Sequence, residues 1–351
     1  MNFEKYLHNQ IQLHPNTQPQ DLVKLCYQAA FGAEHLLTDI SSAKTYFYSE
    51  YHLTPASSEN LYEEISSTVC RINLSAWKKT GMPEEWLFRM FVNSASVSST
   101  GNSLFFYYLK IADEFVQIHK LTFTFSQWKD YLAKYKELGM PSVHHSQIYR
   151  ESEHPAYRIV HKRFIRLLPI LKKAALLSDN DAPNIIAIDG RAASGKSTLA
   201  DDLKLVLNGS IVHIDDFFLP PELRTKERYA KPGGNIHYER FKSEILPMLN
   251  HPNAFSYRIF NCHDMNYGRH RSVEESKWRI VEGAYSHHPY FEEYADIKVF
   301  SDICSEKQME RIRKRNGEQI AERFRTEWIP LEENYYKYYQ IKEHSDIVIS
   351  N

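Results

Sequence analysis

The segment Gly190–Ser197, GRAASGKS, has residue types and a spacing that can hold a phosphate chain. It fits the GxxxxGK[ST] pattern of the phosphate loop, or Walker A motif, at every fixed position. Glycines let consecutive backbone amides curve around phosphate oxygens, Lys196 can reach the terminal phosphates, and the Ser197 hydroxyl can ligate Mg²⁺. An apolar strand pattern precedes the loop and a helical pattern follows it, as the motif requires. The nucleotide-binding residues that we predict are Gly190, Ala193, Ser194, Gly195, Lys196, Ser197 and Thr198.

Two consecutive carboxylates, Asp215 and Asp216, end the next apolar pattern along the chain, at 210–214. Ligands bind at the carboxyl ends of the strands in a parallel sheet, so Asp215 can face the terminal phosphate and accept a proton from an attacking hydroxyl. We expect Asp216 to point away from that position. The alternative is that both residues only cap the turn.

Two further charged elements follow. The short apolar pattern 278–281 delivers Glu282 to the same sheet edge, where the alternative is a capping carboxylate. Arginines then gather between 311 and 325, and Arg311 and Arg315, four residues apart, share a helix face. Cations placed there can stabilise charge on a transferring phosphoryl group and displace water. The alternative is a solvated, salt-bridged surface helix.

These elements, in this order, resemble the uridine kinase, phosphoribulokinase and pantothenate kinase superfamily, and most of all bacterial uridine kinase-like proteins. The resemblance rests on the phosphate loop, the DDFF segment from Asp215, Glu282-Gly283 after a strand, and the arginine-rich segment before Trp328. It covers about residues 181–351. It implies an ATP- and Mg²⁺-dependent phosphotransferase with an alcohol as acceptor. It also implies that Asp215 is the catalytic base, that Glu282 joins Ser197 at Mg²⁺, and that a lid closes over the phosphates, with Arg315 and Arg323 as our preferred pair.

The same resemblance implies where the acceptor binds. In uridine kinases an acidic residue near a helix start binds the ribose hydroxyls, and a Tyr and a His in the following hairpin contact the base. The matching positions are Glu239, Tyr257 and His263, beside Asp215, and they imply a nucleoside acceptor. This chain has His237 where related sequences often have Asp. That departure motivates a second hypothesis, an ATP-binding regulatory module that engages a partner protein.

The elements that must position these residues lie in the second half of the chain. Short apolar runs alternate there with helical patterns, which predicts an α/β P-loop NTPase fold, a parallel sheet flanked by helices. The predicted strands are 184–189, 210–214, 278–281, 297–301 and 346–349, and the predicted helices are 198–207, 238–249, 306–315 and 327–339. The small, polar segment 178–183 predicts a boundary between a helical domain, 1–178, and the P-loop domain, 181–351.

The first half is expected to be mostly α-helical, with helices at 21–37, 61–80, 84–94 and 157–177. It has no motif that we can assign. Its polar clusters, Glu34 and His35 and then His144, His145 and Arg158, could form a second ligand or catalytic site, which would make the chain bifunctional. In that case His35 shares a cleft with His144 or His145. The alternative, which we favour, is a helical interaction domain whose histidines are structural.

Composition excludes several classes of protein. The chain has 351 residues, 43 Lys and Arg against 44 Asp and Glu, and a net charge of −1, so we expect neither nucleic acid nor a membrane surface as partner. No apolar run approaches the ~20 residues that span a bilayer, and the first residues lack a secretory signal pattern. The four separated cysteines suit reduced thiols, with no disulfide framework or zinc site. We therefore expect a cytoplasmic enzyme that binds ATP and a small metabolite, and a homo-oligomer stays open.

Overall fold

The computed structural model describes residues 3–33, 39–57, 60–95, 101–177 and 182–351. The chain divides into two compact units, Met1–Arg166 and Leu167–Asn351. The polar segment expected to join two domains includes residues 178–181, which lie outside the described residues, so the limits inferred from it stay a prediction. Helix α9, Leu168–Ala174, belongs to the second unit.

The second unit is built on a five-stranded sheet in the order β10-β9-β4-β8-β5, in which every neighbouring pair is parallel. The central strand β4 is buried on both faces from its second residue onward, so its apolar run is continuous rather than alternating. The parallel sheet flanked by helices that the sequence predicts is therefore confirmed. The strands are β4, Asn184–Gly190; β5, Ser210–His213; β8, Trp278–Glu282; β9, Ile297–Asp302; and β10, Ile347–Ser350.

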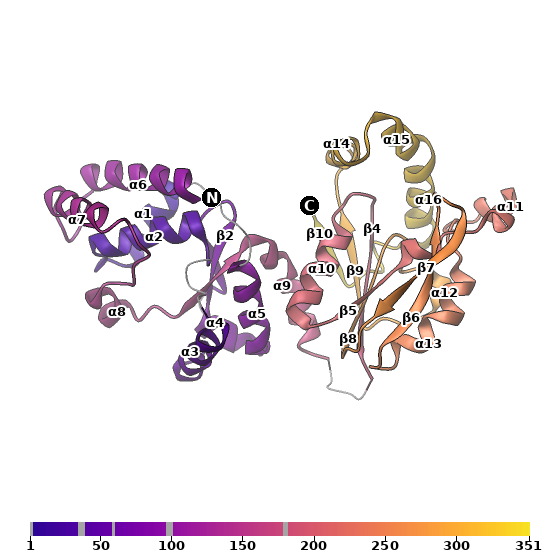
Figure 1. Cartoon of the computed structure of the whole chain (residues 1–351), viewed down its shortest axis with the longest axis horizontal. Helices are drawn as coiled ribbons and strands as arrows, with labels where there is room; N and C mark the ends of the chain where they lie inside the picture. The colour runs from indigo at the N-terminus through magenta and orange to yellow at the C-terminus, as the bar shows by residue number, and fades with distance from the viewer. Residues whose placement is uncertain (1–2, 34–38, 58–59, 96–100, 178–181) are drawn as a thin grey trace. The chain divides into compact units, whose positions relative to one another are not determined.

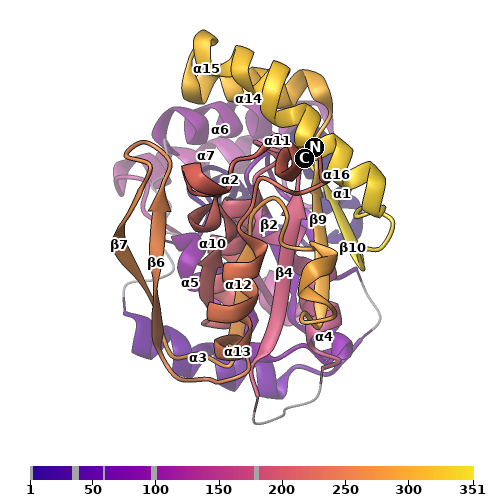
Figure 2. The same cartoon turned by 90° about the vertical axis from the view of Figure 1, so that its right-hand side faces the viewer.

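Helices cover both faces of this sheet. In Figures 1 and 2, α9 and α10 lie on one face and α12, α13 and α16 on the other, while α14 and α15 stand above the carboxyl ends of the strands. A core of aromatic and aliphatic side chains joins the sheet to the second group of helices. The helices are α10, Lys196–Leu207; α12, Tyr238–Glu244; α13, Leu246–Leu249; α14, Ser305–Asn316; α15, Glu318–Arg323; and α16, Ile329–Tyr339.

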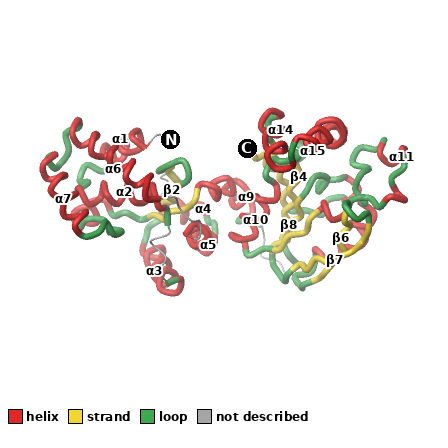
Figure 3. Tube along the Cα trace, turned by 45° about the horizontal axis from the view of Figure 1, so that its top comes forward, coloured by secondary structure: helices red, strands yellow, loops and turns green. Residues whose placement is uncertain are grey.

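One predicted helix of this unit differs from the structure, and the structure adds the strand order and a hairpin. The predicted helix 238–249 divides into α12 and α13, because Pro247 lies in the first turn of α13 and cannot continue a preceding helix. The sequence does not give the strand order; strand β5 pairs with β8 and forms the edge of the sheet. Between β5 and β8 the chain inserts the antiparallel hairpin of β6, Phe255–Asn261, and β7, Asn266–Val273, drawn in yellow in Figure 3.

The first unit is mostly helical, as expected. Its helices are α1, Phe3–Leu13; α2, Pro19–Phe31; α3, Ile40–Leu53; α4, Leu74–Thr80; α5, Glu84–Ala95; α6, Gly101–Ile118; α7, Phe125–Glu137; and α8, Gln147–Glu153. It also contains a small antiparallel sheet, β1-β2-β3, formed by Tyr62–Glu64, Val69–Asn73 and Tyr157–His161. No helix among the described residues is long and apolar enough to cross a membrane.

Two of the predicted helices in the first unit are wrong. Residues 61–80 form β1, β2 and α4, and residues 157–177 begin with β3. Short runs such as VCRIN and YRIVH are apolar enough to fit a helical face, but their branched residues pack better in a pleated sheet. Pairing between β2 and β3 spans more than 80 residues, so no local pattern announces it.

Candidate active site

A cavity of about 1060 Å³ lies in the second unit, bounded by the phosphate loop, the end of β5, the β6–β7 turn and the lid segment α14–α15. It brings together most of the residues that the sequence singled out. The predicted site residues that line it are Ala193, Gly195, Lys196, Ser197, Thr198, Asp215, His263, Glu282, Arg315 and Arg323. Gly190, Ser194, Glu239 and Tyr257 are not among its lining residues.

The phosphate loop has the backbone that its sequence requires. Gly190 has φ +136°, and a Cβ there would lie 2.0 Å from the Ser301 carbonyl oxygen, so only glycine fits. Gly195 is left-handed, with φ 94°, and α10 begins at the next residue. Lys196 Nζ donates to the carbonyl oxygens of Gly190, at 2.7 Å, and of Arg191, at 3.0 Å. The amino end of α10 and a lysine thus meet at one end of the cavity, which is an anion-binding arrangement.

Side chains of helix α16 form hydrogen bonds with the phosphate loop and with Asp189 just before it. Tyr335 donates to Asp189 Oδ2 at 2.9 Å, Tyr336 donates to the Gly190 carbonyl at 2.7 Å, and Glu332 accepts the Ala192 backbone N–H at 3.0 Å. These three side chains lie three and four residues apart, on one helix face. Sequence reasoning missed all of them, although the spacing of Glu332, Tyr335 and Tyr336 was the available signal.

Asp215 stands at the wall of the cavity, where water reaches it. The surrounding protein desolvates its carboxylate and raises the pKa; nearby Lys196 lowers the pKa and Glu282 raises it. Gly283, with φ +136°, packs against this group, since a Cβ there would lie 3.3 Å from Asp215 Oδ1. A carboxylate with a raised pKa is a stronger proton acceptor, which suits a general base. Asp216 points elsewhere, accepting from Arg271 Nε at 2.6 Å and Tyr257 at 2.9 Å.

The two predicted metal ligands are adjacent. Ser197 Oγ lies 3.2 Å from Glu282 Oε2, and the other carboxylate oxygen, Oε1, lies 2.5 Å from His213 Nδ1. His213 fixes the orientation of Glu282, a role that the sequence did not reveal. No group of three or more His, Cys, Asp or Glu side chains is placed to hold a metal within the part of the chain that the structure describes. One carboxylate and one hydroxyl suit Mg²⁺, which usually completes its shell with phosphate oxygens and water.

The lid arginines separate into two groups. Arg311, Arg315 and Arg323 line the cavity, and Arg311 donates to the Ala193 carbonyl oxygen at 3.2 Å. Arg315 donates to the Asn316 side chain, and Arg323 pairs with Glu327 at 3.1 Å. Arg313 and Arg325 instead pair with Glu318 and Glu322 outside the cavity. A π-helical turn, η6, Phe324–Trp328, joins the lid to α16, and such turns often occur at functional sites.

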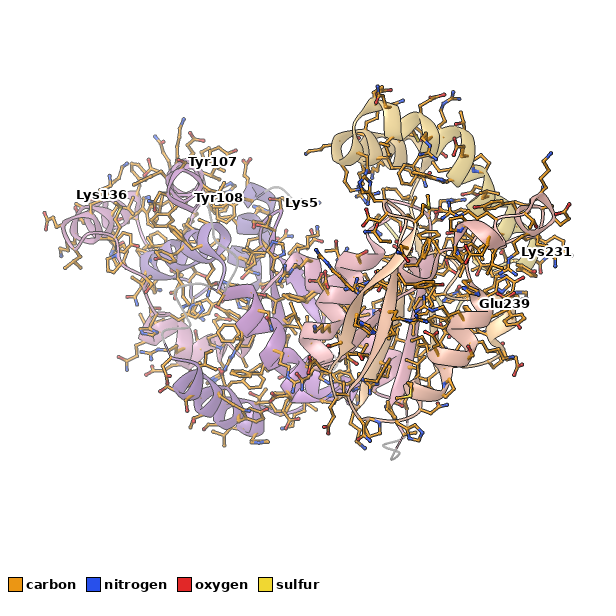
Figure 4. All side chains as sticks on the ribbon, turned by 45° about the vertical axis from the view of Figure 1, so that its right-hand side comes forward. Lys5, Tyr107, Tyr108, Lys136, Lys231 and Glu239 are labelled. Carbon is orange, nitrogen blue, oxygen red and sulfur yellow. The ribbon has the colours of Figure 1, made fainter. Side chains whose placement is uncertain are left out.

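The residues expected to contact a nucleoside are not all available. Glu239, labelled in Figure 4, is held bidentately by Arg228, with N–O distances of 2.5 and 2.9 Å. Tyr257 is buried, where it donates to Asp216 and accepts the His213 backbone N–H at 3.1 Å. Only His263 of these three lines the cavity.

The polar residues of the first unit that could form a second site have different surroundings. His145 is nearly buried between Asp21, at 2.9 Å from Nδ1, and Tyr157, at 2.6 Å from Nε2. Burial lowers its pKa to about 4. His144 is exposed. Arg158 pairs with Glu50, whereas Tyr157, the residue before it, contacts His145. The structure therefore does not join His145, His144 and Arg158 in one site. Glu34 and His35 lie outside the described residues, so the shared cleft stays a prediction.

No protein-family model matches the chain, and no curated protein matches it. Among solved structures, a possible uridine kinase from Bacillus stearothermophilus matches at 16% identity and a TM-score of 0.42, covering 54% of this chain and 99% of the other. A candidate fructose transport system kinase from Silicibacter sp. TM1040 matches at 19% identity and a TM-score of 0.40, covering 52% and 95%. Both matches extend over about half of this chain.

Proposed function

We propose that this protein is an ATP-dependent kinase that transfers the γ-phosphate to a hydroxyl group of a small molecule. The observation that carries the proposal is the placement of Asp215 in the same cavity as Lys196 and the Ser197–Glu282 pair. A phosphate loop alone is shared by GTPases, motors and kinases. A carboxylate that can accept a proton, in the cavity that also contains the phosphate-loop lysine, is what transfer to a hydroxyl needs.

The transfer follows from these positions. The acceptor hydroxyl oxygen attacks the γ-phosphorus, and a new O–P bond forms while the bond from that phosphorus to the β,γ-bridging oxygen breaks. ADP leaves with the electron pair of the broken bond, and the hydroxyl proton passes to the Asp215 carboxylate. Lys196 and the loop amides hold the phosphates, and Arg311, Arg315 and Arg323 stabilise the charge that develops on them.

The residues at the loop fit Mg²⁺, because a hydroxyl and an oriented carboxylate converge there. Ser197 and Glu282 would hold the ion. When bound, Mg²⁺ supplies positive charge to the phosphate oxygens. His213 keeps Glu282 turned toward that position through its Nδ1.

The test separates turnover from nucleotide binding. Asp215→Asn should lower kcat by about 10²- to 10⁴-fold, because general base catalysis is lost, while the Kd for ATP stays within about twofold of wild type. The acceptor is first identified by incubating the protein with γ-labelled ATP and a metabolite extract. The matched control is Asp201→Asn, an exposed carboxylate on α10 outside the cavity.

Two outcomes would contradict the proposal. Full turnover in Asp215→Asn would remove Asp215 from the mechanism. ATP binding without any labelled product would instead favour the regulatory hypothesis, in which ATP alters how the chain binds a partner protein.

A further inference from the structure

Arg224 lines the cavity from the segment that follows the end of β5. Its Nε donates to the Leu219 carbonyl oxygen at 2.8 Å, and its guanidinium lies 5.9 Å from the centre of the Phe260 ring. Within the described parts of the chain, no carboxylate forms a hydrogen bond or ion pair with it. The guanidinium is held by the Leu219 carbonyl and by a hydrogen bond with the Cys262 thiol, and it has no carboxylate partner in the described ranges.

Arg224 and Asp215 line the same cavity. Cys262, in the β6–β7 turn, connects the two electrostatically: burial raises the pKa of its thiol, Arg224 lowers it and Asp215 raises it. Cys262 lines the cavity together with Arg224 and Asp215. The lid arginines and Lys196, by contrast, contact the phosphate loop or residues of the lid itself. Arg224 thus shares the cavity with the base, and its own contacts are to Leu219, Phe260 and Cys262 rather than to the phosphate loop.

The next arginine along the chain, Arg228, differs from Arg224 because it is paired with a carboxylate. Arg228 holds Glu239 bidentately and lies 3.7 Å from the Tyr238 ring centre. That pairing removes the carboxylate that could bind a sugar diol. The other cavity residues in the stretch 218–273 are Phe218, Tyr229, Asn235, Cys262, His263 and Met265, and none is acidic. Among the described cavity residues between 215 and 273, Arg224 is therefore the one arginine or lysine and Asp215 the one carboxylate.

We propose that the acceptor is an anionic alcohol, a molecule that presents a hydroxyl to Asp215 and a carboxylate or phosphate group to Arg224. The inference rests on the proposed kinase function and narrows its substrate class. A guanidinium presents a planar pair of N–H donors that matches both anions, and such charge-assisted pairs are among the strongest hydrogen bonds. A neutral nucleoside would leave this cation without a partner.

The experiment measures phosphorylation of paired acceptors by the full chain with MgATP. Each pair contains a neutral alcohol and an anionic alcohol of similar structure. Glycerol is set against glycerate and ribose against ribose 5-phosphate, with uridine as a neutral nucleoside. A metabolite extract with γ-labelled ATP runs in parallel, and its labelled product is identified by mass spectrometry. Anionic members should be phosphorylated in preference to their neutral partners, and the two pairs distinguish a carboxylate from a phosphate. In the extract, the acceptor should carry one of these groups besides its hydroxyl.

Variants of Arg224 then test whether this side chain causes the preference for anionic acceptors. With the anionic acceptor, Arg224→Ala should raise KM by about 10- to 100-fold with a smaller change in kcat, because the anion lies away from the reacting atoms. Arg224→Lys should recover part of this loss, since the charge remains but the paired donors do not. The KM for ATP should not change. Arg269→Ala, an exposed arginine on β7 outside the cavity, is the matched control.

The possible failures differ. A neutral acceptor found in the extract, or an Arg224→Ala variant that keeps its acceptor KM, would overturn the inference and leave the kinase proposal standing. An increase in the KM for ATP in that variant would also overturn it, because Arg224 would then serve the nucleotide. No labelled product in any arm would overturn the kinase proposal, and this inference with it.

Discussion

Gly283 packs directly against the group that we assign as the base. A Cβ at this position would lie 3.0 Å from Ile214 Cβ and 3.3 Å from Asp215 Oδ1, on a backbone with φ +136°. We expect Gly283→Ala to lower the free energy of unfolding by about 1–3 kcal/mol and kcat by about 100-fold, since the strain displaces Asp215. Chemical denaturation and steady-state kinetics measure the two effects. Gly268→Ala, with open space around its Cβ, should change neither; equal losses in both variants would show that the packing at Gly283 is not the cause.

Glu332 carries a second prediction, about pH. Burial, with nearby Asp215 and Asp189, raises its pKa from 4.5 to about 7, although Lys196 and the Ala192 N–H oppose the shift. The folded state therefore holds this proton more tightly than the unfolded state. Its contribution to stability is complete below about pH 4.5 and is lost as pH rises through 7. The shift corresponds to about 3 kcal/mol of differential stability.

The prediction is that Glu332→Gln becomes progressively more stable relative to wild type between pH 4.5 and 7.5, as measured by denaturant unfolding at each pH. Glutamine can still accept the Ala192 N–H but has no proton to lose. Glu343→Gln, an exposed carboxylate, serves as the control and should show no such trend. A constant difference across this pH range would mean that Glu332 is ionised throughout.

The lid helices carry arginines of two kinds, those that line the cavity and those that do not, and single substitutions can compare them. Arg315→Ala and Arg323→Ala should each lower kcat by about 10²-fold, since each removes a cation from the phosphate end of the cavity. Arg313→Ala and Arg325→Ala, whose side chains form exposed ion pairs outside the cavity, should stay within about twofold of wild type. Equal effects in all four variants would indicate a general electrostatic field rather than contacts within the cavity.

At the level of elements, the sequence predicted the second unit better than the first. In the α/β half, glycine-rich and charged turns follow each buried run, so all five strands lie within a residue or two of their predicted positions. In the first half, β2 and β3 depend on pairing between distant segments, which overrides local preference.

The sequence predicted some of the residues that line the cavity and missed others. Asp215, Lys196 and Glu282 stand at fixed places in recognisable patterns, and the cavity contains all three. Glu332, His213 and Arg224 were missed, because their surroundings come from elements that lie far apart in the sequence. Glu239 and Tyr257 were expected to contact substrate, but their side chains are engaged by Arg228 and Asp216.

At the level of the whole molecule, the two units should respond to different perturbations. Each forms a compact body of its own, so we expect two thermal transitions in calorimetry. MgATP should raise the Tm of the second transition alone, and Lys196→Ala should abolish that rise. Asp21→Asn should lower the first Tm alone, because the buried Asp21 accepts hydrogen bonds from His145 and Ser146. A single transition moved by both perturbations would mean that the units unfold together.

The insertion between β5 and β8 has a consequence for protein engineering. Residues 218–273 supply Arg224 and the β6–β7 turn to the cavity, while the phosphate loop, α16 and the lid come from outside that stretch. Strand β5 is the edge of the sheet and keeps its pairing with β8 through its own backbone. The same stretch contains α12 and α13, and its side chains Phe241, Ile245 and Leu249 belong to the core that covers one face of the sheet. A segment exchanged for one from another protein of this fold must therefore keep these apolar side chains, so that selection for a new acceptor does not disturb the sheet that carries the phosphate loop.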